Sequence, residues 1–399
     1  MMKDIKNPCF IYTMLWCVYW CQGILYQSGG IVSQSVAFLI LAMSLIYTCK
    51  YLLSNSIAGY TKALLFVLLL VSVYGGVAYI TDGDTIRGLE DDTRLFAWFK
   101  NMYLSILPVF TYLCFVKEGY LEVGHVKKMM PLIIIAILCS YYWSLTTAIQ
   151  QAILKTGDEV NEVTNNAGYS VISLIPVLLL YDQKKVVQYI GLFFILALVV
   201  LSMKRGAVLL YGIMSFCFVL RSFRHASVQK KLLIILLLVI LFVLGYYFIE
   251  YLLSESDFLR QRIEDTKEGK TSGRTDLYKV LWDSFMNQAS PLIVLFGGGV
   301  WYTTKLAWTA AHNDWIEFLI DMGVFGVLVY LYYWLSFFRL SVSKRLPNLS
   351  RFCIFLIFIK LFIKTLYSMS IDTMTFIDGI MISLSYYGML DTQKYVRRY

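Results

Sequence analysis

The residues with the clearest capacity for chemistry are a few cations and one histidine that border apolar segments of the chain. Lys204 and Arg205 lie between two apolar runs, Arg274 lies inside a polar stretch over residues 254–311, and His312 closes that stretch. Arginine makes bidentate contacts with phosphate, and lysine acts as a point charge. Histidine can act as a general base near neutral pH. These residue types together suit the binding of a pyrophosphate and the removal of a proton from a hydroxyl group.

The cations also have simpler interpretations. Lys204 and Arg205 would serve equally well as a pair that snorkels to the membrane surface, or as an anchor for an anionic lipid headgroup. Arg274 precedes a segment with helical periodicity, and a cation in the first turn of a helix is unfavourable against the helix dipole. That position favours an external partner for Arg274. The alternative is a solvated side chain paired with Asp276 or Asp283.

His312 is followed by polar residues that could support it as a base. Asn313 and Asp314 come directly after it, and Glu317 follows five positions on. A neighbouring carboxylate can orient an imidazole or stabilise its protonated form. We therefore expect Asp314 or Glu317 to do this for His312.

Lys360 and Lys364 lie four residues apart inside an apolar run, hence on one face of a helix. Two like charges at this spacing repel each other unless an anion neutralises them. A charged side chain at membrane depth is also energetically costly, so it usually has a partner of opposite charge or a function. The anion could be a diphosphate, or a carboxylate such as Asp372 or Asp378.

Composition sets the class of the protein. The chain has 399 residues, of which 59% are hydrophobic and 15% are charged, and the mean hydropathy is +0.65. Such values are rare in soluble domains and indicate a polytopic α-helical membrane protein. The net charge of +9 is better explained by basic cytoplasmic loops than by a nucleic-acid partner. The 8 cysteines lie mostly in apolar segments and the 3 histidines are scattered, so no metal site is expected.

Runs of roughly 20 apolar residues recur along the chain, and each is long enough to cross a bilayer as a helix. We predict twelve spans in a single integral membrane domain over residues 1–399. The spans cover residues 10–26, 31–53, 62–80, 99–116, 130–150, 168–181, 186–203, 207–220, 232–253, 315–338, 351–367 and 375–390. The segment 168–181 is short and is expected to be tilted or partial.

The distribution of lysine and arginine predicts the orientation. Alternate connections carry clusters such as Lys127-Lys128 and Lys184-Lys185, whereas the opposite loops are acidic or mixed. Because positive loops stay in the cytoplasm, both termini are predicted to be cytoplasmic. Residues 254–314 then form one large external loop between the ninth and tenth spans.

A set of short motifs resembles the O-antigen ligase/polymerase superfamily of bacterial membrane enzymes. Those motifs are Asn165-Asn166-Ala167-Gly168-Tyr169, Lys204-Arg205-Gly206-Ala207, Ser272-Gly273-Arg274, Pro291 before Gly297-Gly298-Gly299, and Ala311-His312-Asn313 with Glu317 and Gly323-x-x-Gly326. The resemblance covers about residues 165–340 by motif, and the rest of the chain by topology only. The combination of these motifs is more specific than any one of them.

The resemblance implies a GT-C-like fold and transfer of a glycan from undecaprenyl diphosphate at the periplasmic face of the inner membrane, without a metal or cofactor. By position, Arg205 and Arg274 would bind the donor diphosphate and His312 would be the general base. Lys204 departs from the serine or threonine usual before the first arginine. The family motifs do not include Lys360 and Lys364, so their role as diphosphate ligands depends on the physical argument alone. The supporting residues would be Asn313, Asp314, Glu317, Asn166 and Tyr169.

Several functions fit these features. A polymerase would pass the chain to another lipid-linked repeat unit in O-antigen, capsule or exopolysaccharide synthesis, and a ligase would pass it to lipid A–core. We favour the polymerase, for which a chain-length regulator and a flippase would be further partners. A transporter of lipid-linked glycans is the alternative from another class. It would predict charges along the centres of several helices and two related halves, and the sequence shows neither.

Overall fold

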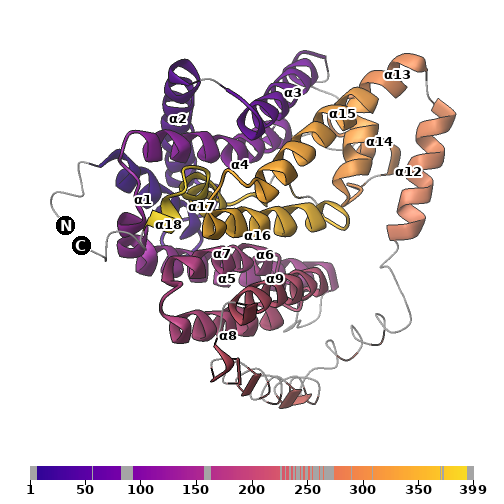
Figure 1. Ribbon diagram of the computed structural model, residues 1–399. Helices are drawn as coiled ribbons and strands as arrows, with labels where there is room; N and C mark the ends of the chain where they lie inside the picture. The colour runs from indigo at the N-terminus through magenta and orange to yellow at the C-terminus, as the bar shows by residue number, and fades with distance from the viewer. Residues whose placement is uncertain are drawn as a thin grey trace. The chain divides into compact units, whose positions relative to one another are not determined.

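The computed structural model describes residues 7–55, 57–81, 93–156, 163–224, 274–288, 290–307, 309–368, 370 and 373–392, with scattered residues between 227 and 264. This part of the chain forms helices and contains no strand (Figure 1). It divides into two compact units. Unit 1 comprises Met1–Trp143 and Asp276–Tyr399, and unit 2 comprises Ser144–Thr275.

Unit 1 contains most of the helices. They are α1 (Pro8–Trp20), α2 (Ile31–Ser54), α3 (Tyr60–Thr81), α4 (Thr93–Lys117), the first part of α5 (Val123–Thr156), most of α12 (Arg274–Gln288), α13 (Pro291–Phe296), α14 (Tyr302–Ala307), α15 (Asp314–Val342), α16 (Asn348–Thr365), α17 (Phe376–Tyr386) and α18 (Met389–Thr392). The helix α4 packs against α2, α3 and α17, and its Phe110, Leu113 and Phe115 are fully buried. It therefore forms the buried centre of the group made by α2, α3, α4 and α17.

The helix α3 has one buried face and one exposed apolar face. Leu64, Val67 and Val71 are buried, whereas Val73 and Val77 are more than half exposed. In water, such a stripe of exposed apolar side chains would be unfavourable, but in a bilayer it is the face that contacts lipid. The pattern agrees with a membrane protein.

Within the part of the chain that the structure describes, six helices are long and apolar enough to cross a membrane. They are Ile31–Ser54, Tyr60–Ile80, Trp98–Lys117, Val123–Leu154, Arg205–Arg224 and Asp314–Val342. Three shorter apolar helical segments, Gly168–Tyr181, Lys185–Leu201 and Phe376–Tyr386, coincide with further predicted spans. The span predicted over residues 232–253 lies largely outside the described residues. The polytopic helical class is thus supported, while twelve spans, the GT-C-like fold and the orientation stay predictions.

The span predicted over residues 315–338 is interrupted in the structure. Gly323 inside α15 has φ 69° and ψ −170°, a conformation that favours glycine. The break frees carbonyl groups of the preceding turn from their helical donors. The amides of Gly298 and Gly299 donate to two of them, Ile320 O at 3.0 Å and Asp321 O at 2.9 Å. The glycine-rich turn after α13 is thereby fixed to the break.

Both glycines at this crossing are required by the close approach of the two backbones. A Cβ atom on Gly297 would lie 2.3 Å from the carbonyl of Asp321, and one on Gly323 would lie 2.4 Å from Leu295 O. The Tyr74 hydroxyl of α3 donates to the carbonyl oxygen of Phe296, the residue before Gly297, at 2.6 Å. The two glycine motifs therefore form one structural joint.

Unit 2 holds the end of α5, the short helices α6 (Gly168–Ile172), α7 (Leu174–Val177) and η2 (Leu178–Tyr181), and the longer α8 (Lys185–Leu201) and α9 (Arg205–Arg224). The short helices α6 and α7 and the 3-10 turn η2 occupy residues 168–181, the segment predicted to form a tilted or partial span. Its Pro176 lacks a backbone donor and its neighbours have 3-10-like dihedral angles. The helix α6 packs against both α8 and α9.

Candidate functional site

The turn between α8 and α9 carries two of the predicted cations. Lys204 and Arg205 follow Met203, which has a positive φ of 52°, and both cations are half-buried. The buried Ser202 closes the turn, because its hydroxyl donates to Val199 O at 2.6 Å and its oxygen accepts from Lys204 N at 3.4 Å. Arg205 is the first residue of α9, and it directly follows a turn that these hydrogen bonds hold in place.

A second segment of unit 2 is tied to this turn. Asn165 donates its backbone N–H to Ser202 O at 2.8 Å, and its side-chain oxygen accepts from Ala167 N at 2.9 Å. Asn165 is fully buried, whereas the predicted site residue Asn166 is exposed. Asn165 therefore holds the segment against the cationic turn, whereas the side chain of Asn166 is exposed.

Gly168 allows the close packing of this segment on the turn. A Cβ atom at position 168 would lie 2.5 Å from Ser202 Oγ, so a side chain there would displace one of the two segments. We expect Gly168→Ala to lower the stability by about 1–3 kcal/mol, the usual cost of overpacking, and to lower glycan transfer with it. Thermal unfolding of the purified protein in detergent measures the first effect.

The matched control for Gly168→Ala is Gly212→Ala in α9 of the same unit. A Cβ atom at Gly212 meets nothing within 4 Å, and alanine is favoured over glycine inside a helix. This variant should unfold at the parental temperature or slightly above it. Equal behaviour of the two variants would contradict the packing role assigned to Gly168.

Arg274 is the third predicted cation, and it is the first residue of α12. It lies within electrostatic range of the phenol of Tyr169, which is buried in α6. The helix predicted for the segment after Arg274 is confirmed. Arg274 and the cationic turn belong to the same unit, and Tyr169 lies one residue beyond the Gly168 contact described above.

His312 lies in unit 1, just before α15, and its own backbone is strained. It has a φ of 54°, in the left-handed region that costs a side chain about 1–2 kcal/mol. Histidine is among the residues enriched there, and such outliers concentrate at functional sites. The side chain is exposed, while the preceding Ala311 is fully buried. The backbone is therefore anchored and the imidazole is presented to the surface.

Glu317 anchors the peptide on the N-terminal side of His312. Its carboxylate accepts from Ala311 N at 2.5 Å and from the Thr303 hydroxyl at 2.7 Å. One helical turn further along α15, Asp321 accepts from Thr303 N at 2.8 Å and from Trp301 N at 3.1 Å. Glu317 and Asp321 thus hold α14 and the residue before His312 against one face of α15.

Asn313 and Asp314 anchor the other side of His312. The Asn313 oxygen accepts from Trp315 N at 3.0 Å and caps α15, and its amide donates to Leu366 O at 3.1 Å. The buried Asp314 accepts from the Tyr330 hydroxyl at 2.6 Å, and from Ser370 N at 3.1 and 3.0 Å. These hydrogen bonds therefore hold the start of α15 against the segment after α16.

Lys360 and Lys364 join α16 to the segment that leads into α17. Lys360 Nζ lies 2.5 Å from Asp378 Oδ2, and Lys364 Nζ donates to the Thr373 hydroxyl at 2.5 Å. Both lysines are 3% exposed. The same Asp378 oxygen accepts from the backbone and the hydroxyl of Thr375, at 2.8 Å each. For Lys360, these contacts support the carboxylate alternative; Asp372 lies outside the described residues.

A buried ion pair of this kind predicts a large effect when one partner is removed. We expect Lys360→Met to destabilise the protein by about 3–5 kcal/mol, because the buried Asp378 carboxylate then loses the charge of Lys360. The double variant Lys360→Met, Asp378→Asn should recover most of this loss, because asparagine removes the charge but keeps an oxygen that can accept from Thr375. Thermal unfolding in detergent compares the two. If the double variant were as unstable as the single one, the pair would not be the reason for the loss.

The comparison with known protein families adds to this geometry. Residues 190–331 match a family model described as O-antigen ligase. The resemblance to the O-antigen ligase/polymerase superfamily is confirmed. A search of curated proteins finds no match to the chain.

The O-antigen ligase match contains Lys204, Arg205, Arg274, His312 and Glu317, together with both glycine motifs of the joint. It supports a membrane enzyme of the glycan ligase or polymerase type, with lipid-linked glycans as substrates. The supporting Asn166 and Tyr169 precede the matched stretch, and Lys360 and Lys364 follow it. The predicted sites thus fall in two places, a cationic turn in unit 2 and an anchored histidine in unit 1.

Sequence reasoning missed several residues that build these places. Asn165 and Ser202 fix the cationic turn, and Thr303, Asp321 and Tyr330 fix the surroundings of His312. One signal was available for Asp321, because it lies four residues after Glu317 and therefore on the same helix face. The others make contacts over long sequence separations, which the spacing of residues does not reveal.

Proposed function

We propose that the protein is a glycan polymerase. It transfers an oligosaccharide chain from undecaprenyl diphosphate to a hydroxyl of a second lipid-linked repeat unit at the periplasmic face of the inner membrane. The observation that carries the proposal is the fixed turn that presents Arg205, in a stretch that matches the O-antigen ligase family and also contains Arg274 and His312.

Arg205 and Arg274 bind the donor diphosphate in this proposal. A guanidinium makes two parallel hydrogen bonds to phosphate oxygens, and charge-assisted bonds of this kind are stronger than neutral ones. As the diphosphate leaves, negative charge develops on its bridging oxygen, and fixed positive groups stabilise that charge. Lys204 adds a further positive charge next to Arg205. The arginines supply the charge neutralisation, and no metal is invoked.

His312 acts as the general base. Its imidazole takes the proton from the acceptor hydroxyl as the hydroxyl oxygen forms a bond to the anomeric carbon of the donor sugar. The bond between that carbon and the diphosphate oxygen breaks, and undecaprenyl diphosphate leaves with the electron pair. A single displacement of this kind inverts the anomeric centre. The contacts of Ala311, Asn313 and Asp314 support the role, because they hold the backbone on both sides of the imidazole.

The second candidate function is that of an O-antigen ligase, which the description of the matched family favours. The donor and the chemistry are the same, and only the acceptor differs: a ligase passes the chain to lipid A–core. The residues described above act on the donor and on the acceptor hydroxyl, so they serve either enzyme.

The experiment that tests the proposal is transfer in vitro with the purified full-length protein. The donor is a defined repeat unit on undecaprenyl diphosphate, and separate reactions contain either the same lipid-linked unit or lipid A–core as acceptor. A polymerase extends the lipid-linked unit into a ladder of products. Transfer only to lipid A–core would identify a ligase. No transfer to either acceptor, by protein that remains folded, would reject both functions.

A further inference from the structure

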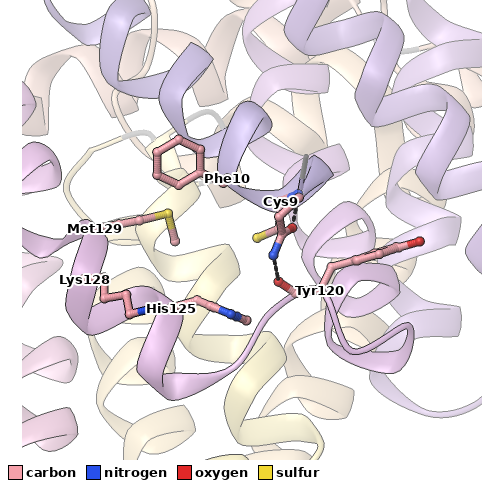
Figure 2. A pocket seen from close by; sticks show the side chains of 7 residues that line it. Cys9, Phe10, Tyr120, His125, Lys128 and Met129 are labelled. Carbon is pink, nitrogen blue, oxygen red and sulfur yellow. Dashed lines mark hydrogen bonds between the residues drawn. The ribbon is translucent and has the colours of Figure 1, made fainter. Parts of the chain in front are cut away.

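A cleft in unit 1 is lined by none of the candidate site residues. It is a shallow, open cleft between the start of α1 and the start of α5, with about 310 Å³ of space that includes its open mouth. Asn7, Cys9 and Phe10 line it from α1, and His125, Lys128 and Met129 line it from α5, with Tyr120 between them. Figure 2 shows Cys9, Phe10, His125, Lys128 and Met129 around a common space, with His125 and Lys128 next to each other, whereas the ring of Tyr120 points away from it.

The two walls of the cleft are joined by one side chain. Asn7 caps α1 by accepting from Cys9 N at 2.9 Å, and its amide donates to Tyr120 O at 2.8 Å. The second of these bonds spans 113 residues of sequence and fixes α1 to the loop that leads into α5. The cleft is therefore preformed, which lowers the entropic cost of binding a ligand.

His125 is oriented to donate a hydrogen bond from Nε2. Its Nδ1 accepts from Glu122 N at 3.3 Å, so the neutral imidazole carries its proton on Nε2. The half-buried ring lines the cleft. A donor of this kind complements an anionic oxygen in the neutral form, and more strongly in the protonated form.

Lys128 lies three residues after His125, on the same face of α5. Its side chain is exposed at the mouth, whereas Cys9 and Met129 are buried in the wall. The cleft is therefore cationic at its rim and apolar inside. Both α1 and α5 also begin here, and their N-terminal ends add partial positive charge. This combination matches an amphipathic ligand with an anionic head.

We propose that this cleft binds an anionic phospholipid, with the headgroup phosphate on His125 Nε2–H and Lys128 Nζ and the start of an acyl chain against Phe10 and Met129. A free phosphate would satisfy the two donors but would leave the apolar wall uncovered. The predicted orientation places this end of the chain at the cytoplasmic leaflet, whose surface is negatively charged by its anionic lipids. The site is independent of the proposed transferase function.

The test uses the purified full-length protein with added phosphatidylglycerol or phosphatidylcholine, and native mass spectrometry to count the lipids retained. The parental protein should retain phosphatidylglycerol in preference to phosphatidylcholine. The variant His125→Leu, Lys128→Met should bind phosphatidylglycerol about 10-fold more weakly or worse, since it loses hydrogen bonds to a charged group. Lys128→Arg should bind as the parent does.

The matched control is Lys127→Met. This variant removes the same charge from the neighbouring position, whose side chain does not line the cleft. General attraction of lysines to an anionic surface would affect both lysine positions equally. Binding of the double variant as tight as that of Lys127→Met would overturn the proposal. Unfolding temperatures establish that each variant is folded, and Lys128→Glu, at an exposed position, provides a second variant expected to lose binding.

A parallel series with inorganic phosphate separates the two sources of the anion. The proposal expects millimolar phosphate to leave the retained phosphatidylglycerol in place. If phosphate binds in a manner that depends on His125 and Lys128 while phosphatidylglycerol is not retained, the ligand is free phosphate and the lipid assignment is overturned.

Discussion

Replacing Arg205 with alanine is expected to lower the rate of glycan transfer about 10²- to 10³-fold, the range found when one fixed donor to a developing negative charge is removed. Arg205 is the first residue of α9, on a turn held by Ser202 and Asn165. Arg205→Lys should give an intermediate rate, because lysine keeps the charge but loses the bidentate geometry. The measurement is the initial rate of transfer with the lipid-linked repeat unit.

Arg221 provides the matched control for Arg205. It lies in the last turn of the same helix, where it pairs with Asp182 at 3.4 Å. Arg221→Ala removes an identical charge from α9 and should leave the rate within about twofold, since it lies at the opposite end of the helix from Arg205 and Asp182 keeps Lys185 as an ion-pair partner. If Arg205→Ala retained the parental rate at equal protein amounts, Arg205 would not be a donor ligand.

Replacing His312 with asparagine is expected to lower the transfer rate about 10²- to 10⁴-fold, the contribution of a general base. Asparagine is chosen because it tolerates the left-handed backbone of position 312, where φ is 54°. The fold should therefore be kept while the base is lost. His312→Ala should lose both the base and some stability, because alanine does not favour this conformation.

The dependence of the rate on pH separates a base from a purely structural residue. A protonated imidazole cannot accept the proton of the acceptor hydroxyl, so the parental rate should fall as the pH is lowered. The low residual rate of His312→Asn should lack that decrease. An asparagine variant that is folded, active and as pH-dependent as the parent would exclude His312 as the base.

Much of the helical layout could be predicted from the sequence, because an apolar run of roughly 20 residues has few alternatives in a bilayer. The long helices α2 to α5, α9 and α15 coincide with predicted spans. The break at Gly323 and the division of 168–181 into short helices could not be predicted. Hydropathy measures only the transfer of side chains into lipid, whereas these breaks depend on backbone contacts with other segments.

The partner of Lys360 is another feature that could not be predicted from the sequence. The spacing of Lys360 and Lys364 required an anion nearby, but it did not distinguish a diphosphate from a carboxylate. Asp378, eighteen positions further along the chain, lies at the start of α17, where the cap with Thr375 places its carboxylate against Lys360. Only the packing of α16 on α17 decides the partner.

The sequence by itself indicated the membrane class, the resemblance to the O-antigen ligase/polymerase superfamily and the residue types at the candidate sites. These depend on composition, on local apolar runs and on short motifs such as the one that ends in His312. The tertiary structure alone showed that Asn165 and Ser202 fix the turn of Arg205, and that Glu317 and Asp314 hold the backbone around His312. Such anchors follow from hydrogen bonds between segments that are distant in sequence, and only folding brings those segments together.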